Sequence, residues 1–153
     1  MPQIAFDRAR RFLVDQALPF WSTHGAYDNG CFVERLDLAC NPVDPGFTRV
    51  RVQARQIYVF SHAQWQSVFS AADLTAKAVE FFIRSAWLGP DRGWAKLISR
   101  DGALIDGTYD LYDVSFALFA LGWHYRVTSD PRCLAIARAT LDFLERHARH
   151  PAG

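Results

Sequence analysis

Residues 110–123, DLYDVSFALFALGW, decide the fold class of this chain. From Val114 to Trp123 every residue is apolar except Ser115 and Gly122. A helix that is apolar all round is covered on all sides by other parts of the protein. The stretch therefore predicts a buried helix over residues 109–126, around which the rest of the chain packs.

Four further helices are predicted on either side of this one, because apolar residues recur there at helical spacing. In the first of them, Pro19 is expected to bend or end the helix. The last begins with Asp130 as its N-cap and Pro131 in its first turn, two residue types that favour the start of a helix. The four helices cover residues 4–22, 49–69, 73–88 and 131–148.

Short strand-like segments interrupt the helices. Residues 31–37 alternate between apolar and polar and predict a short strand, and residues 42–46, with two prolines and a glycine, predict a loop. Residues 93–98 and 103–105 flank an Arg-Asp-Gly turn, which is a hairpin signal. A hairpin followed by two helices thus occurs twice. We therefore expect an all-α fold of stacked helical hairpins with short β-hairpin excursions.

The composition limits the classes of function. The 153 residues carry 17 basic and 16 acidic side chains, so the basic excess of a nucleic-acid-binding protein is missing. Charges interrupt every apolar stretch, and neither a membrane span nor a secretory signal is expected. The three cysteines are widely spaced and form no disulfide framework. These features favour one domain in the reducing cytoplasm, with neither nucleic acid nor a membrane as partner.

The helix over residues 49–69 carries a polar stripe. Arg51, Arg55, Tyr58 and His62 point within about 40° of a common direction. Such a stripe either faces water, with arginines that snorkel, or lines a cavity in which a cation binds a substrate oxygen. Periodicity alone favours the solvated face.

The helix over residues 109–126 presents a comparable face. Tyr109, Tyr112, Asp113, Phe116 and Trp123 share it. Aromatic rings beside a carboxylate are typical of sugar-binding surfaces. They equally fit an aromatic core with buried polar tips, which periodicity alone favours.

No metal or cofactor site is expected from residue spacing. His147 and His150 are three residues apart, but two ligands do not make a metal site. His24 and His124 have no evident partner in the sequence. Phosphate-binding glycine loops and nucleophile elbows are missing as well.

Several segments, taken in order, resemble the N-terminal part of the N-acylglucosamine 2-epimerase family. That family includes mannose isomerases, cellobiose 2-epimerases and sulfoquinovose isomerases. The block RVQARQIYVFS at residues 51–61 is the most specific segment of the match. The other segments are Phe20-Trp21-x-x-His24-Gly25, Asn29-Gly30-Cys31-Phe32, Leu36-Asp37, residues 110–121 and Tyr125-Arg126-x-Thr128-x-Asp130-Pro131.

The resemblance implies a fold, a pocket and a reaction. The family fold is an (α/α)6 toroid of paired helices around a central pocket, and residues 1–153 would form its N-terminal portion. Arg55 and Tyr112 would bind a small-molecule sugar. The implied reaction is isomerisation or epimerisation at C2 of an aldose through an enediolate, without metal or redox cofactor. Further pocket-lining residues would be Arg51, Tyr58, His62, Tyr109, Asp113 and Phe116.

Two departures from the family limit this expectation. The match covers only the first part of the family's length, and none of the five histidines matches the family's catalytic motifs, so no catalytic residue is expected within this chain. Val114 stands where relatives often have His or Gln. Helix faces left uncovered would favour self-association or marginal stability.

Two other functions remain open from the sequence. The first is a non-catalytic helical-hairpin module that binds a sugar or a protein partner. The second is a glycoside hydrolase, which needs two carboxylates on opposite sides of a cleft. Asp110 and Asp113 lie close together on one predicted helix and fit that geometry poorly.

Overall fold

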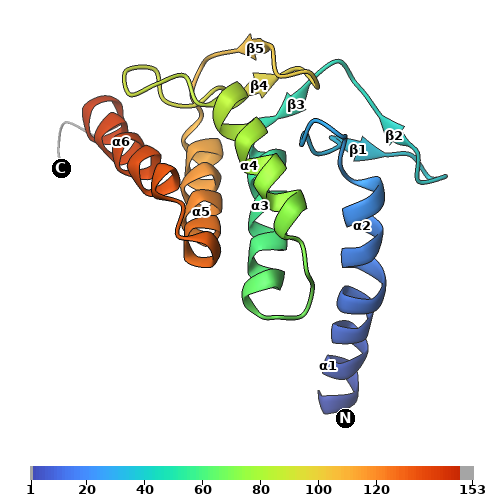
Figure 1. Ribbon diagram of the computed structural model, residues 1–153. Coiled ribbons are helices and arrows are strands. Elements are labelled where there is room, and N and C mark those ends of the chain that lie inside the picture. Colours follow the sequence, from blue (N-terminus) through green and yellow to red (C-terminus); the bar gives the residue numbers. More distant parts are fainter. Residues whose placement is uncertain (1, 149–153) are drawn as a thin grey trace.

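A computed structural model describes residues 2–148, in which helices dominate and short strands gather at one end (Figure 1). The expected all-α class with short β excursions is confirmed. No helix within the described residues is long and apolar enough to cross a membrane. The elements are α1 (Pro2–Arg11), the π-helical segment η1 (Phe12–Ala17), α2 (Leu18–His24), β1 (Arg35–Leu36), β2 (Pro42–Val43), β3 (Thr48–Arg49), α3 (Val50–Trp65), α4 (Ala72–Ala86), β4 (Leu97–Ile98), β5 (Leu104–Asp106), α5 (Leu111–Thr128) and α6 (Pro131–His147).

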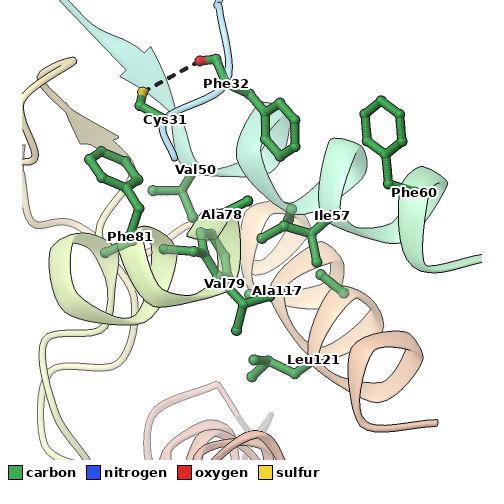
Figure 2. Packing of buried hydrophobic residues seen from close by; sticks show 14 of the residues in the cluster. Cys31, Phe32, Val50, Ile57, Phe60, Ala78, Val79, Phe81, Ala117 and Leu121 are labelled. Atoms are coloured by element: carbon green, nitrogen blue, oxygen red, sulfur yellow. Dashed lines mark hydrogen bonds between the residues drawn. The ribbon is translucent and has the colours of Figure 1, made fainter. Parts of the chain in front are cut away.

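The hydrophobic core lies where α3, α4 and α5 meet. Ile57 of α3, Val79 of α4 and Leu121 of α5 pack toward one another and are buried (Figure 2). On the other side, α6 packs against α5. The prediction that α5 is covered on all sides is wrong, because Phe119 is 46% exposed. The apolar residues of α5 therefore lie on two sides of the helix, one facing the core and one facing solvent.

A small antiparallel sheet fixes the relative position of α3 and α5. Strand β4 pairs with β3 through Thr48 and Ile98, and with β5 through Leu97 and Asp106. Since β3 runs directly into α3 and β5 precedes α5, both helices start at the same end of the molecule (Figure 1). They consequently run parallel and pack directly against each other, and α4 returns in the opposite direction, packed mainly against α3.

The first predicted helix continues past the proline that was expected to bend or end it. The chain stays helical from α1 through η1 and α2 to His24. In η1 the hydrogen bonding shifts, so that the Leu18 N–H donates to the Leu13 carbonyl. Pro19 then lies in the first turn of α2, where its missing N–H is tolerated.

The strand predicted over residues 31–37 shortens to Arg35–Leu36, which pairs with β2. Before β1, the backbone N–H and carbonyl of Phe32 both form hydrogen bonds with a side chain. Its N–H donates to Gln53 Oε1 at 2.7 Å, and its carbonyl accepts from Gln53 Nε2 at 2.8 Å. Pairing with β1 also makes Pro42–Val43 a strand, where a loop was predicted.

The remaining helix boundaries differ from the predictions by up to four residues. Helix α3 starts one residue late because Arg49 belongs to β3, and it ends at Trp65. Helix α5 starts at Leu111, with Asp110 as its N-cap, and extends to Thr128. Helix α6 begins as predicted, with Asp130 capping it and Pro131 in the first turn.

The N-terminal helix leaves apolar side chains in contact with water. Ile4, Phe6 and Phe12 are all well exposed. Exposed apolar residues on a helix arm are the kind of surface from which self-association was expected. Self-association stays a prediction.

Candidate functional site

The parallel helices α3 and α5 present polar and aromatic side chains along their shared open edge. In each helix these side chains are separated by four, three, four and three residues, which keeps them on one face. We call this surface the α3–α5 face. It consists of Arg51, Arg55, Tyr58, His62 and Trp65 of α3, and of Tyr112, Phe116, Phe119, Trp123 and Arg126 of α5.

Charge pairing holds the end of the face next to the sheet. Arg51 Nη1 donates to Asp113 Oδ1 at 2.8 Å, and the Asp113 side chain is only 1% exposed. This hydrogen bond raises the pKa of Arg51. Asp110 accepts hydrogen bonds from the N–H groups of Tyr112 and Asp113 and so caps α5. The cap and the ion pair together fix the turn that carries Tyr112.

Arg55 lies between two aromatic side chains of α5. Its guanidinium donates a hydrogen bond to the hydroxyl of Tyr112 and lies 4.4 Å from the centre of the Phe116 ring. Arg55 and Tyr112 are both exposed. The pair therefore offers solvent a cation, a hydroxyl and an aromatic surface at one point.

Farther along the helices the face is aromatic. The Tyr58 and Phe119 rings are 4.5 Å apart, and the His62 and Trp123 rings are 4.2 Å apart. The Tyr58 hydroxyl and His62 Nδ1 lie at hydrogen-bond distance, 3.2 Å. Aromatic rings packed in this way form a broad apolar surface with polar edges.

Three members of the face were missed by the sequence reasoning. Trp65 and Phe119 are exposed, and Arg126 lies 4.4 Å over the Trp65 ring. Each follows a predicted face residue of its helix by three positions. Applying the same three- and four-residue spacing along the whole of both helices would have found them.

The structure brings together all the predicted site residues except Tyr109. Tyr109 precedes α5, and its hydroxyl donates to the carbonyl of His147 at 3.1 Å. Its ring packs edge-on against Phe143 of α6, 5.1 Å away. Tyr109 therefore faces α6, whereas Tyr112 faces α3.

The carboxylates near this site serve structural purposes. Asp110 caps a helix and Asp113 pairs with Arg51, so neither is free to act on a glycosidic bond. On α3, the nearest face histidine to Arg55 is His62. His62 follows Arg55 by seven positions, which corresponds to about 10 Å along the helix.

Comparison with known proteins shows the family of this chain. Residues 30–153 match the family model described as N-acylglucosamine 2-epimerase (GlcNAc 2-epimerase). The chain belongs to the N-acylglucosamine 2-epimerase family. Sugar epimerases and isomerases make up this family, in agreement with the resemblance of the 51–61 block.

Two curated relatives are similar over nearly the whole of this chain. A mannose-6-phosphate isomerase of Rhizobium meliloti (strain 1021) is 31% identical over 146 residues, covering 92% of the chain and 37% of the relative. A cellobiose 2-epimerase of Ruminococcus albus is 24% identical over 147 residues, covering 94% and 37%. The chain thus spans somewhat more than a third of the length of these curated relatives.

Solved structures share the fold. A cellobiose 2-epimerase of Spirochaeta thermophila DSM 6192 superposes with a TM-score of 0.84 at 25% identity, over 95% of this chain and 36% of that one. A sugar epimerase from a ruminal bacterium gives 0.87 at 23% identity, over 96% and 38%. The helical hairpins of this chain therefore correspond to part of an (α/α)6 toroid, as expected.

Proposed function

We propose that this chain forms the substrate-holding part of a sugar 2-epimerase or aldose–ketose isomerase. The α3–α5 face would line the central pocket, and an open-chain sugar would bind against Arg55 and Tyr112. The observation that carries this proposal is the Arg55 guanidinium, held beside the Tyr112 hydroxyl and the Phe116 ring on an exposed surface. Family membership supports a sugar as the ligand.

The proposed chemistry follows from the position of the carbonyl group. The proton on C2 lies α to the carbonyl of the open-chain aldose. Its removal by a base gives an enediolate, and its return to C1 or to the other face of C2 gives the ketose or the epimer. The oxygen that gains negative charge in this step needs a nearby cation, and Arg55 would supply it.

The acid and base of this reaction would come from helices outside this chain. The chain spans about 37% of its curated relatives, and His62 lies about 10 Å along α3 from Arg55. We therefore propose Arg55 and Tyr112 as binding groups only. Arg51 and Asp113 would position the turn that carries Tyr112, and Tyr58, His62 and Phe116 would line the pocket.

A second candidate function is sugar binding without turnover. It is favoured by the same separation between Arg55 and His62, because a proton acceptor must lie within hydrogen-bond reach of the proton that it removes. Both candidates use the same pocket. They differ in whether proton exchange at C2 takes place.

Calorimetric titration of the chain with mannose, cellobiose and N-acetylglucosamine tests the shared pocket. Arg55→Gln is expected to weaken binding at least tenfold, since a hydrogen bond to a charged group contributes about 1.5–3 kcal/mol. Arg84→Gln is the matched control, because Arg84 is also exposed and lies over an aromatic ring, that of Phe81. Equal affinity in the Arg55 and Arg84 variants would contradict the pocket.

Proton exchange at C2 tests whether this chain by itself supplies a base. The bound sugar is incubated with the chain in D2O, and loss of the C2 proton signal is followed by NMR. No exchange is expected, because the proposed base lies in helices outside this chain. Exchange that disappears in His62→Gln would place the base on α3 and overturn that expectation.

A further inference from the structure

Three potential metal ligands meet at the turn between α5 and α6. His124 lies in the last two turns of α5, Asp130 is the N-cap of α6, and Cys133 lies in the first turn of α6. A ring nitrogen, a carboxylate oxygen and the Sγ atom of these residues lie within 4.8 Å of one another. Spacing along the sequence did not indicate this group, because the αL conformation of Ser129 reverses the chain between its members.

One of these three side chains has a buried nitrogen atom that lacks a hydrogen-bond partner in the part of the chain that the structure describes. His124 is only 4% exposed, and its Nδ1 atom is buried without a hydrogen-bond partner among the described residues. Buried polar atoms are normally hydrogen-bonded, and an exception calls for an explanation such as an ion.

We propose that His124, Asp130 and Cys133 bind one Zn²⁺ ion. Imidazole nitrogen, thiolate sulfur and carboxylate oxygen are the donor types that zinc takes in proteins. Bonds of about 2.0–2.3 Å in a tetrahedral site place ligand atoms roughly 3.3–3.8 Å apart. The ligand atoms, now within 4.8 Å of one another, would have to approach by about 1 Å to reach that spacing. The Cys133 thiol gives its proton to solvent as the sulfur–zinc bond forms, and water takes the fourth position.

The site opens to solvent through Asp130. Cys133 is fully buried, whereas the Asp130 side chain is 17% exposed and forms the outer edge of the group. Arg132 donates to both carboxylate oxygens of Asp130, and Glu80 also accepts from Arg132 at 2.7 Å. Glu80 can therefore keep Arg132 in place while Asp130 turns one oxygen to the ion.

The position of the group gives the ion a structural role. The turn lies at the end of the helices opposite the strands (Figure 1). His124 follows Tyr112 by twelve positions, which corresponds to about 18 Å along α5. An ion here would fasten α5 to α6 at the end of α5 that lies far from Tyr112. The inference is thus independent of the proposed function.

Titration with Co²⁺ followed by absorption spectroscopy tests the site, with the chain first treated with a chelator. One equivalent of Co²⁺ is expected to give a thiolate-to-metal charge-transfer band together with the visible bands of a tetrahedral ion. Both are expected to persist in Cys40→Ser, which removes the exposed cysteine, and to disappear in Cys133→Ser. No band in the unsubstituted chain, or a band that survives Cys133→Ser, would overturn the proposal.

A second variant guards against misfolding of the cysteine variant. Asp130→Asn keeps a good N-cap for α6 but removes the negative charge. It is expected to fold, as judged by circular dichroism, and to bind Co²⁺ at least tenfold more weakly. Zinc is expected to raise the melting temperature of the unsubstituted chain more than that of Asp130→Asn. Equal Co²⁺ affinity and equal shifts by zinc would contradict the site.

Discussion

Arg51 and Asp113 are 62 residues apart in the sequence, yet they join α3 to α5 through a 2.8 Å hydrogen bond. The two ends of this bond differ in environment, because the Arg51 side chain is 25% exposed and that of Asp113 is 1% exposed. The second carboxylate oxygen, Oδ2, is buried without a partner among the described residues. Without Arg51, the buried carboxylate of Asp113 would lose its charged partner. Without Asp113, the guanidinium of Arg51 would still reach water.

That asymmetry predicts unequal costs for breaking the pair. Arg51→Met leaves a buried carboxylate unpaired and is expected to lower the free energy of unfolding by about 3–5 kcal/mol. Asp113→Asn keeps an acceptor for Arg51, which also reaches water, and is expected to cost about 1 kcal/mol. Urea denaturation at neutral pH measures both. A larger loss for Asp113→Asn than for Arg51→Met would contradict this dependence.

The N-cap of α5 predicts a second stability difference. Asp110→Ala removes the acceptor for two backbone N–H groups and is expected to cost about 1 kcal/mol. Asp110→Asn keeps the acceptor and is expected to cost only a few tenths. Thermal melting followed by circular dichroism compares them. If the two variants melt at the same temperature, the cap does not stabilise the turn that carries Tyr112.

The core predicts a strong dependence on burial within a single helix. Ile57→Ala leaves a cavity between α3, α4 and α5 and is expected to cost about 2–5 kcal/mol. Val59→Ala, on the exposed side of α3, is expected to cost about 0.5 kcal/mol. Urea unfolding gives both values. Similar losses in the two variants would mean that α3 does not pack as described.

Cysteine reactivity is expected to differ between two thiols. Burial raises the pKa of Cys31 to about 12, and at pH 8 roughly one thiol in ten thousand is ionised. Cys40 is exposed. Iodoacetamide at pH 8 should therefore label Cys40 in the folded chain and reach Cys31 only after unfolding, as peptide mass spectrometry can show. Labelling of Cys31 as fast as Cys40 in the folded chain would refute its burial.

Helices were predictable where local signals are strong. Asp130 and Pro131 marked the start of α6 correctly, because capping acts within a few residues. Strands were harder to predict. The Phe32 backbone bonds to the Gln53 side chain, and β3 pairs with β4 about 50 residues away. Such partners cannot be read from local alternation.

The site was predictable only as far as local helical spacing reaches. Helical periodicity placed Arg51, Arg55, Tyr58 and His62 on one face, and these side chains do share a face. It could not tell that this face adjoins α5, because that depends on a sheet formed by distant strands. The same periodicity grouped Tyr109 with Tyr112. Helical spacing does not apply to Tyr109, however, because α5 begins at Leu111.

The measurement that tests the sugar pocket most directly is an NMR titration of the isotope-labelled chain with cellobiose. Binding at the α3–α5 face predicts progressive shifts in the Arg55 side-chain N–H and in the amides of Tyr112 and Phe116. The indole N–H of Trp94 should not move, because it is buried and donates to Thr140. Shifts centred elsewhere, or no shift at saturating sugar, would contradict the assignment of this face to substrate.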